Sequence, residues 1–142
     1  MIDKVDAFDW VTARSKCSTS AVFERLKLQI NEDVEKRNAL IGGPPSPYIF
    51  RVISNGPIVT VLLEGHRLRA SVMFRLQNEF ISVSDDNDNL LFHAAVTLND
   101  EGRCVVKIND EDRELWQMRK MALEKLFFAV AIRGGNFFDS NA

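Results

Sequence analysis

Residues 85–89, which read Asp-Asp-Asn-Asp-Asn, are the densest run of potential metal ligands in the sequence. Alternating Asp and Asn is typical of the start of a calcium-binding EF-hand loop. Such a loop also needs Gly at its sixth position and a bidentate Glu at its twelfth. Counted from Asp85, these positions hold Leu90 and Val96, and the flanking segments are strand-like rather than helical. We therefore predict a solvated hairpin loop and no metal site.

Catalytic chemistry has few candidate residues. His66 and His93 are the only histidines, and zinc or iron sites need three or four ligands, usually with more than one His or Cys. No nucleophile with an orienting base is recognisable around either histidine. The glycine pairs 42–43 and 134–135 follow helical segments instead of opening them, so neither forms a phosphate-binding loop. The sequence predicts no catalytic, cofactor or metal site and favours a non-catalytic protein.

The two cysteines, Cys17 and Cys104, lie far apart in the sequence and match no metal-binding spacing. We expect two reduced thiols that behave as small hydrophobic residues. A disulfide between the two cysteines is the alternative if the protein is exported. Residues 1–6 carry no apolar segment of the kind found in signal peptides, and no stretch is long enough to span a membrane. These features predict a cytoplasmic protein.

The basic residues allow one binding hypothesis. Several arginines fall on the expected solvent side of a sheet, where they are candidate contacts for an anion: Arg51, Arg67, Arg69, Arg75 and Arg103. Single-stranded nucleic acid also needs aromatic side chains for base stacking, and only Phe80 joins them there. Glu64 and Glu79 can pair with arginines across strands, and the net charge of the chain is −2. A solvated charged face is favoured, and nucleic acid is disfavoured.

Six segments rich in β-branched and aromatic residues predict the sheet that would carry these side chains. Residues 68–76 show the clearest alternation of apolar and polar side chains, as a half-buried strand requires. The connections are two to five residues long, which is too short for parallel crossovers, so the sheet should be an antiparallel meander. The predicted strands are 48–54, 58–64, 67–76, 80–84, 90–98 and 103–108.

Two amphipathic helices flank the predicted sheet. The first begins near residues 18–20 and ends at Gly42. The second begins between Asp112 and Leu115 and continues to residues 133–135. Its wide apolar face, which includes Trp116, should lie across the sheet.

The ends of the chain are less regular. Residues 8–12 favour a short strand, with a short helix capped by Asp9 as the alternative, so the structure of residues 1–17 is left open. Residues 136–142 should form a loose tail.

The fold class predicted is α+β in a single domain over residues 1–142. If residues 8–12 form a strand, the order strand, helix, six strands, helix resembles the helix-grip arrangement of the START and Bet v 1-like proteins. Without that strand, the order resembles the smaller open sheets of cystatin-like or secretion-chaperone-like domains. Both resemblances rest on element order alone and transfer no functional residue.

The outer face of the predicted sheet is unusually apolar. Six residues should lie there and form a candidate interface: Ile49, Ile53, Leu62, Met73, Phe80 and Leu91. Such a face favours a covering partner, most simply another copy of the chain. We therefore expect an interaction module that self-associates or docks a protein partner through this face. The alternative is a binding protein for a small apolar ligand, held in a pocket between the sheet and the C-terminal helix.

Overall fold

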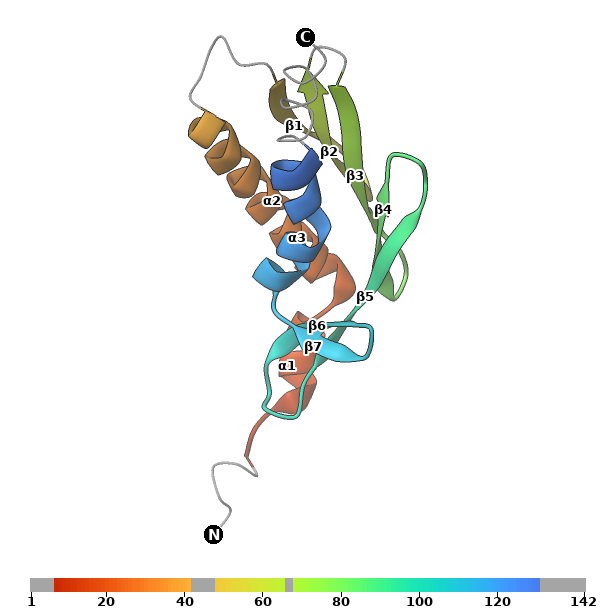
Figure 1. Cartoon of the computed structure of the whole chain (residues 1–142). Helices are drawn as coiled ribbons and strands as arrows, with labels where there is room; N and C mark the ends of the chain where they lie inside the picture. The colour runs from red at the N-terminus through yellow and green to blue at the C-terminus, as the bar shows by residue number, and fades with distance from the viewer. Residues whose placement is uncertain (1–6, 42–47, 66–67, 131–142) are drawn as a thin grey trace.

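The computed structural model describes residues 7–41, 48–65 and 68–130 (Figure 1). In these residues two helices precede seven strands, and a helical segment follows the last strand. The elements are α1 (Trp10–Lys16), α2 (Thr19–Ile41), β1 (Tyr48–Asn55), β2 (Ile58–Gly65), β3 (Leu68–Leu76), β4 (Phe80–Asp85), β5 (Leu90–Leu98), β6 (Cys104–Ile108), β7 (Glu111–Arg113), α3 (Leu115–Glu124) and the π-helical turn η1 (Lys125–Val130).

The strands form one open antiparallel sheet in the order β1-β2-β3-β4-β5-β6-β7, so every strand pairs with its sequence neighbours. The predicted α+β class and antiparallel meander are confirmed. The seventh strand was not predicted. Asn109 and Asp110 adopt positive φ angles of 53° and 65°, which turn the chain tightly enough for Glu111–Arg113 to pair with β6. This short strand lies between the predicted end of the sheet at residue 108 and the predicted start of the last helix.

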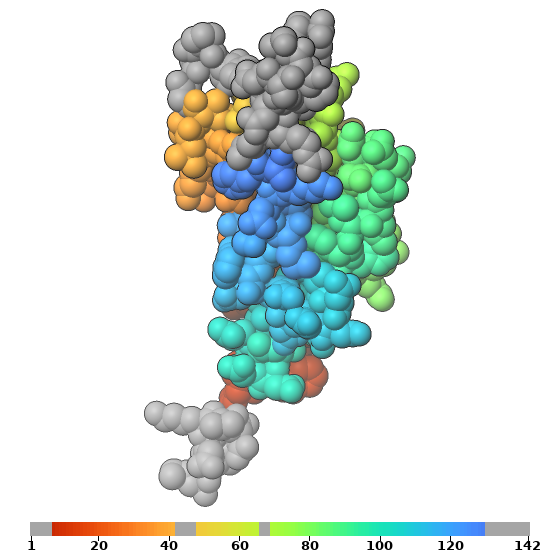
Figure 2. Space-filling view, viewed as in Figure 1, coloured from red at the N-terminus to blue at the C-terminus, as the bar shows by residue number. Residues whose placement is uncertain are grey.

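Both long helices cover one side of the sheet, which we call the inner face; the opposite side is the outer face. α2 and the continuous α3–η1 segment lie side by side over the inner face (Figure 1). In the space-filling view, the blue α3–η1 segment lies between the orange end of α2 and the green strands (Figure 2). One hydrophobic core fills the space between the layers, with Phe23 and Leu26 from α2, Phe74 from β3 and Met118 from α3 almost fully buried. None of the helices in the described ranges is long and apolar enough to cross a membrane.

The N-terminal segment is a helix, which corrects the preferred prediction of a strand at residues 8–12. The Asp9 carboxylate accepts hydrogen bonds from the Thr12 backbone N–H at 3.1 Å and from the Thr12 hydroxyl at 2.6 Å. This side-chain cap satisfies backbone donors that a short helix otherwise leaves exposed. The strand–helix start required for the helix-grip order is therefore absent from residues 10–41, which form α1 and α2.

The boundaries of the long helices largely match the sequence. Ser18 lies just before α2, and its hydroxyl accepts a hydrogen bond from the Ala21 N–H at 3.1 Å. Glu114 precedes α3 in a capping box with Gln117, whose side chain accepts from the Glu114 N–H at 2.8 Å. The predicted end of the last helix at residues 133–135 and the tail at 136–142 lie outside the described residues.

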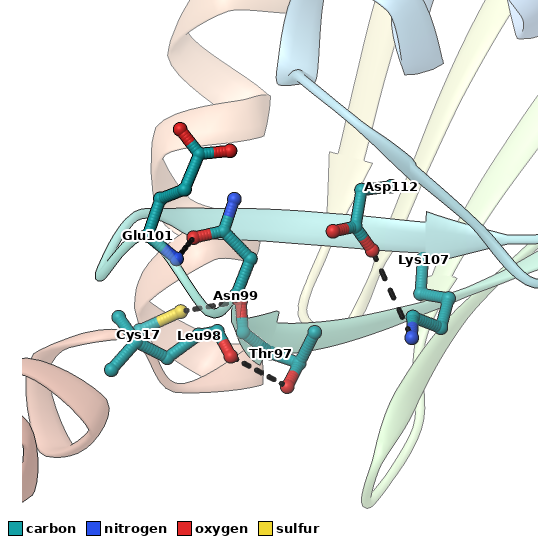
Figure 3. Close-up of polar contacts among 7 residues, drawn as sticks. All are labelled: Cys17, Thr97, Leu98, Asn99, Glu101, Lys107 and Asp112. Carbon is teal, nitrogen blue, oxygen red and sulfur yellow. Dashed lines mark hydrogen bonds and ion pairs between the residues drawn. The ribbon is translucent and has the colours of Figure 1, made fainter.

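Cys17 and Cys104 form a disulfide that joins the α1–α2 junction to the start of β6, with 5.5 Å between their Cα atoms. The expectation of two reduced thiols is therefore wrong, because the sheet brings together residues 87 positions apart. The Cys17 Sγ also lies 3.4 Å from the carbonyl oxygen of Thr97 (Figure 3). A disulfide sulfur carries no proton, so this contact becomes a hydrogen bond only after reduction restores the S–H.

Trp116 is not part of the core, contrary to the sequence analysis: 53% of its surface is exposed, and its indole N–H donates to the Glu114 carboxylate at 3.0 Å. Helical periodicity places Trp116 on the same stripe as Leu123, which is buried. That stripe faces the groove beside α2 rather than the sheet. Its first turn therefore stays open to solvent.

Candidate interaction surfaces

The outer face carries the six residues of the predicted interface. Residues paired across neighbouring strands share a face. The registers therefore place Leu62 beside Arg51 and Met73 beside Thr60 on this face. Ile49, Ile53 and Leu91 are 44–49% exposed. The other three, Leu62, Met73 and Phe80, are half-buried by their neighbours. The structure thus brings the six positions to one face, and their role as an interface stays a prediction.

A β-bulge changes the surface at the start of β5. Val83 pairs with Phe92, but Ser84 pairs with Leu90, so Leu91 is the extra residue in β5. The bulge breaks the alternation locally and leaves Leu90 as well as Leu91 exposed. Simple alternation from Phe92 would place Leu90 on the inner face, whereas its pairing with Ser84 places it at an outer-face position.

The predicted anion contacts do not form one cluster. Arg51, Arg69 and Arg75 lie at outer-face positions, whereas Arg103 lies in the β5–β6 turn and Arg67 lies outside the described residues. The Arg51 guanidinium is 3.7 Å from the Glu64 carboxylate. Arg69 lies opposite the same Glu64 in the β2–β3 register. This acidic neighbour offsets positive charge on the face, so the arrangement does not favour an anion-binding surface.

The polar side chains that could take part in metal binding or catalysis instead contact neighbouring residues. The Asp85 carboxylate accepts hydrogen bonds from the N–H groups of Asn87 and Asn89 and from the Asn89 side-chain amide. These bonds, led by the one from the Asn89 backbone, hold the pKa of Asp85 below its ordinary value. His93 stacks beside Phe80 on the outer face, with 4.5 Å between the ring centroids. His66 lies outside the described residues.

A groove of about 390 Å³ runs between α2 and α3–η1. Its apolar lining comes from Leu40, Trp116, Leu123, Phe127 and Phe128. The Arg119 guanidinium crosses one end and bonds the Asp33 carboxylate and the Gln29 side-chain oxygen, each at 2.6 Å. The groove therefore lies between two helices. The pocket expected from the sequence lay between the sheet and the last helix, where the core side chains pack.

Arg37 anchors the wall of this groove. Only 8% of its surface is exposed, and its Nε donates to the Phe127 carbonyl oxygen at 3.0 Å. Its guanidinium lies 4.7 Å from the centre of the Phe128 ring and 5.6 Å from that of Phe50. The carbonyl and the aromatic faces supply negative potential that stabilises the buried cation. Nothing in the sequence indicates the burial of Arg37, because an Arg within a polar stretch of helix resembles any solvated side chain.

A second, more polar hollow of about 960 Å³ lies where the α1–α2 junction approaches the end of β3, the β3–β4 turn, β5 and β6. Arg14 and Lys107 contribute cations to its lining, and Ser18 and Thr97 contribute hydroxyls. Both cations are already engaged: Arg14 donates to the Cys17 carbonyl at 2.6 Å, and Lys107 lies 3.8 Å from the Asp112 carboxylate (Figure 3). Among the described residues that line the hollow, the remaining charged group is the acidic Glu79, so no uncommitted cation is available there for an anionic ligand.

Comparison with known proteins adds no assignment: no family model, no curated protein and no solved structure matches the chain.

Proposed function

We propose that this protein is a non-catalytic interaction module, which associates with another protein chain through the outer face of its sheet. A second copy is the simplest occupant. The observation that supports the proposal is the contrast between the two faces. Helices cover the inner face, whereas the outer face presents Ile49, Ile53 and Leu91 with nearly half of each surface exposed.

The size of the apolar effect favours a covering partner. Burying one such side chain contributes about 1.5–3 kcal/mol, against a net stability of roughly 5–15 kcal/mol for a typical domain. The outer-face arginines are compatible with an interface, because their stems can cover apolar surface while the guanidinium groups reach the rim. A protein–protein interface needs the outer-face side chains only as contact surface. It therefore requires no cluster of polar groups that converge on one point.

Sedimentation equilibrium at micromolar concentration tests this function. We expect the wild-type protein to sediment at twice the 16.1 kDa mass of the chain. Leu62→Lys and Phe80→Glu place charges within the face and should yield folded monomers, because an unpaired charge is costly to bury. Leu28→Lys is the matched control, since Leu28 is 67% exposed on α2, away from the sheet. A wild-type monomer with equally stable variants would rule out self-association through this face.

A small apolar ligand is the second candidate, favoured by the groove between α2 and α3. Its volume lies in the range of ligand pockets, and its lining is mostly aromatic and aliphatic. Trp116 and Phe128 are about half exposed there and would gain burial from an occupant. This candidate becomes the preferred function if the outer-face variants leave a monomeric protein unchanged.

The cytoplasmic location expected from the sequence stays a prediction. The Cys17–Cys104 disulfide bears on it, because stable disulfides are common in exported proteins and rare in the cytosol of most organisms. The redox state of these two cysteines in the native compartment therefore tests the location directly.

A further inference from the structure

The two edges of the sheet differ in how well they are protected. β7 is only three residues long and carries Glu111 and Asp112, features that discourage pairing with another strand. β1 is eight residues long and reads Tyr-Ile-Phe-Arg-Val-Ile-Ser-Asn, with a single charge at Arg51. A long, apolar edge strand is a template for a further strand, so β1 is the edge that needs an occupant.

The hydrogen-bond ladder shows which β1 groups point outward. Leu76 N–H donates to the Pro57 carbonyl at 2.7 Å, so β2 residues at odd positions bond to β3. In an antiparallel sheet the alternate residues bond to the other neighbour, so even positions of β2 bond to odd positions of β1. The even positions of β1, including Val52 and Ser54, therefore direct their N–H and C=O groups away from β2.

The α2 helix covers one of these outward positions. The Asn38 side chain accepts from the Phe50 N–H at 3.0 Å and donates to the Phe50 carbonyl at 2.8 Å, as a neighbouring strand would. Val52 and Ser54 are the next outward positions along β1, in a stretch where Ile53 and Ser54 are exposed. In the described part of the chain, no hydrogen bond reaches the outward groups of Val52 or Ser54. The free edge is thus the three-residue segment Val52–Ser54.

We propose that this free edge pairs antiparallel with the same segment of a second copy, about a two-fold axis at Ile53. Val52 of each copy then lies opposite Ser54 of the other, and each pair exchanges two backbone hydrogen bonds. The two Ile53 side chains meet on the outer face as a non-hydrogen-bonded pair, whose Cα atoms lie about 4.5 Å apart. The pairing continues one sheet through both copies.

The register of the proposed pairing follows from which backbone N–H and C=O groups of β1 are free. Centring the axis on Arg51 would place two guanidinium groups side by side and would require the Phe50 groups held by Asn38. An axis at Val52 would also require Phe50. An axis at Ser54 would pair Val52 with Gly56, which lies in the turn with φ +59° and cannot extend the strand. Only an axis at Ile53 requires no backbone groups other than those of Val52 and Ser54. This axis places Arg51 opposite Asn55.

This contact differs from the proposed function and does not rest on it. Edge pairing buries the backbone of β1 and leaves both outer faces on the same side of a doubled sheet. The outer-face proposal buries side chains of four further strands. The two contacts are alternative ways for two copies to form a dimer, and each responds to different substitutions.

The first test removes a backbone donor without changing the β1–β2 ladder. Ser54→Pro deletes the outward N–H, and proline is tolerated at edge positions whose N–H is unused within the sheet. We expect the wild type and Ser54→Ala to be dimers in sedimentation equilibrium. Ser54→Pro should raise the dimer dissociation constant at least about 100-fold, because two of the four hydrogen bonds are lost.

The second test reports the register and needs no disruptive substitution. Ile53→Cys should form an intermolecular disulfide under mild oxidation, because about 4.5 Å between Cα atoms suits such a bond. Ile49→Cys is the matched control, with the same residue type, strand, face and similar exposure (49% against 46%). Its counterpart would lie several residues away, so it should remain uncrosslinked on a non-reducing gel.

Each outcome separates the two contacts. A Ser54→Pro dimer, or equal crosslinking of the two cysteine variants, overturns the edge pairing. The outer-face function then still stands if Leu62→Lys and Phe80→Glu dissociate the dimer. A Ser54→Pro monomer beside dimeric Leu62→Lys and Phe80→Glu supports the edge and refutes self-association through the face. A monomeric wild type overturns the edge pairing of two copies and leaves the edge to an extended segment of another protein.

Discussion

At the scale of single residues, polar groups in this protein mostly stabilise local geometry. Asp9 begins α1, Asn99 closes the β5–β6 turn by accepting from the Glu101 and Arg103 N–H groups, and Asp85 organises the β4–β5 loop. Each carboxylate or amide satisfies backbone donors that the turn leaves unpaired. The acidic loop at residues 85–89 is thus explained by turn formation.

The pH dependence of stability should reveal the role of Asp85. Its folded pKa is lowered, chiefly by the hydrogen bond from the Asn89 backbone. A depressed folded pKa means that the contribution is present above the unfolded pKa, about 3.9 for Asp, and is lost as the pH falls through the folded value. Asp85→Asn should therefore lower the melting temperature at pH 7, and the difference from wild type should shrink below about pH 4. The neighbouring Asp86→Asn is the control, and an equal effect from it would contradict this role.

At the scale of elements, the contact between α2 and α3–η1 depends on polar side chains as well as the core. Arg119 links α3 to Asp33 and Gln29, and Arg37 links α2 to the Phe127 carbonyl in η1. These links join the two helices on either side of the groove between them.

Removing the Arg37 guanidinium should test this arrangement. Arg37→Met retains much of the apolar stem but leaves the buried Phe127 carbonyl without its donor, at a cost of about 1–3 kcal/mol. Urea unfolding measures the change in the free energy of unfolding. Arg25→Met on the exposed side of the same helix should change it by less than about 0.5 kcal/mol. Similar values for both variants would show that the Arg37 contact contributes little.

At the scale of the whole molecule, the disulfide connects the N-terminal helices to the far end of the sheet. The α1 helix contributes no buried residue between Trp10 and Lys16, so the adjacent Cys17 is its main attachment. Cys17 is 2% exposed, whereas Cys104 is exposed, so a reductant would reach the bond from the Cys104 side. The bond closes a loop spanning 87 residues, long enough for a large effect on the unfolded chain.

Reduction should therefore destabilise the protein by about 2–5 kcal/mol. Calorimetry with and without dithiothreitol measures the shift in melting temperature, and the double variant Cys17→Ala/Cys104→Ala should be insensitive to the reductant. Hydrogen exchange should increase first in α1, because that helix lacks other buried contacts. An unchanged melting temperature in the reduced wild-type protein would show that the disulfide does not stabilise the fold.

Local patterns in the sequence determined most of the secondary structure. Alternation located the six main strands, short connections required an antiparallel meander, and Ser18 and Glu114 marked helix starts because capping depends on residues a few positions apart. The outer-face positions followed from the same period of two. Where a β-bulge inserts the extra residue Leu91, alternation no longer identifies the face of the residue beyond it, Leu90.

Only the tertiary structure decided which surfaces and pairs those elements create. Cys17 meets Cys104 across 87 positions of the sequence, and Arg37 meets Phe127 across 90. Both contacts depend on how the layers stack. The exposure of Trp116 depends on what α2 places opposite its stripe. The free edge at Val52–Ser54 exists because the Asn38 side chain bonds the backbone of Phe50 but not that of the residues after it. A sequence records each side chain and its neighbours along the chain, whereas burial and pairing are properties of the assembled layers.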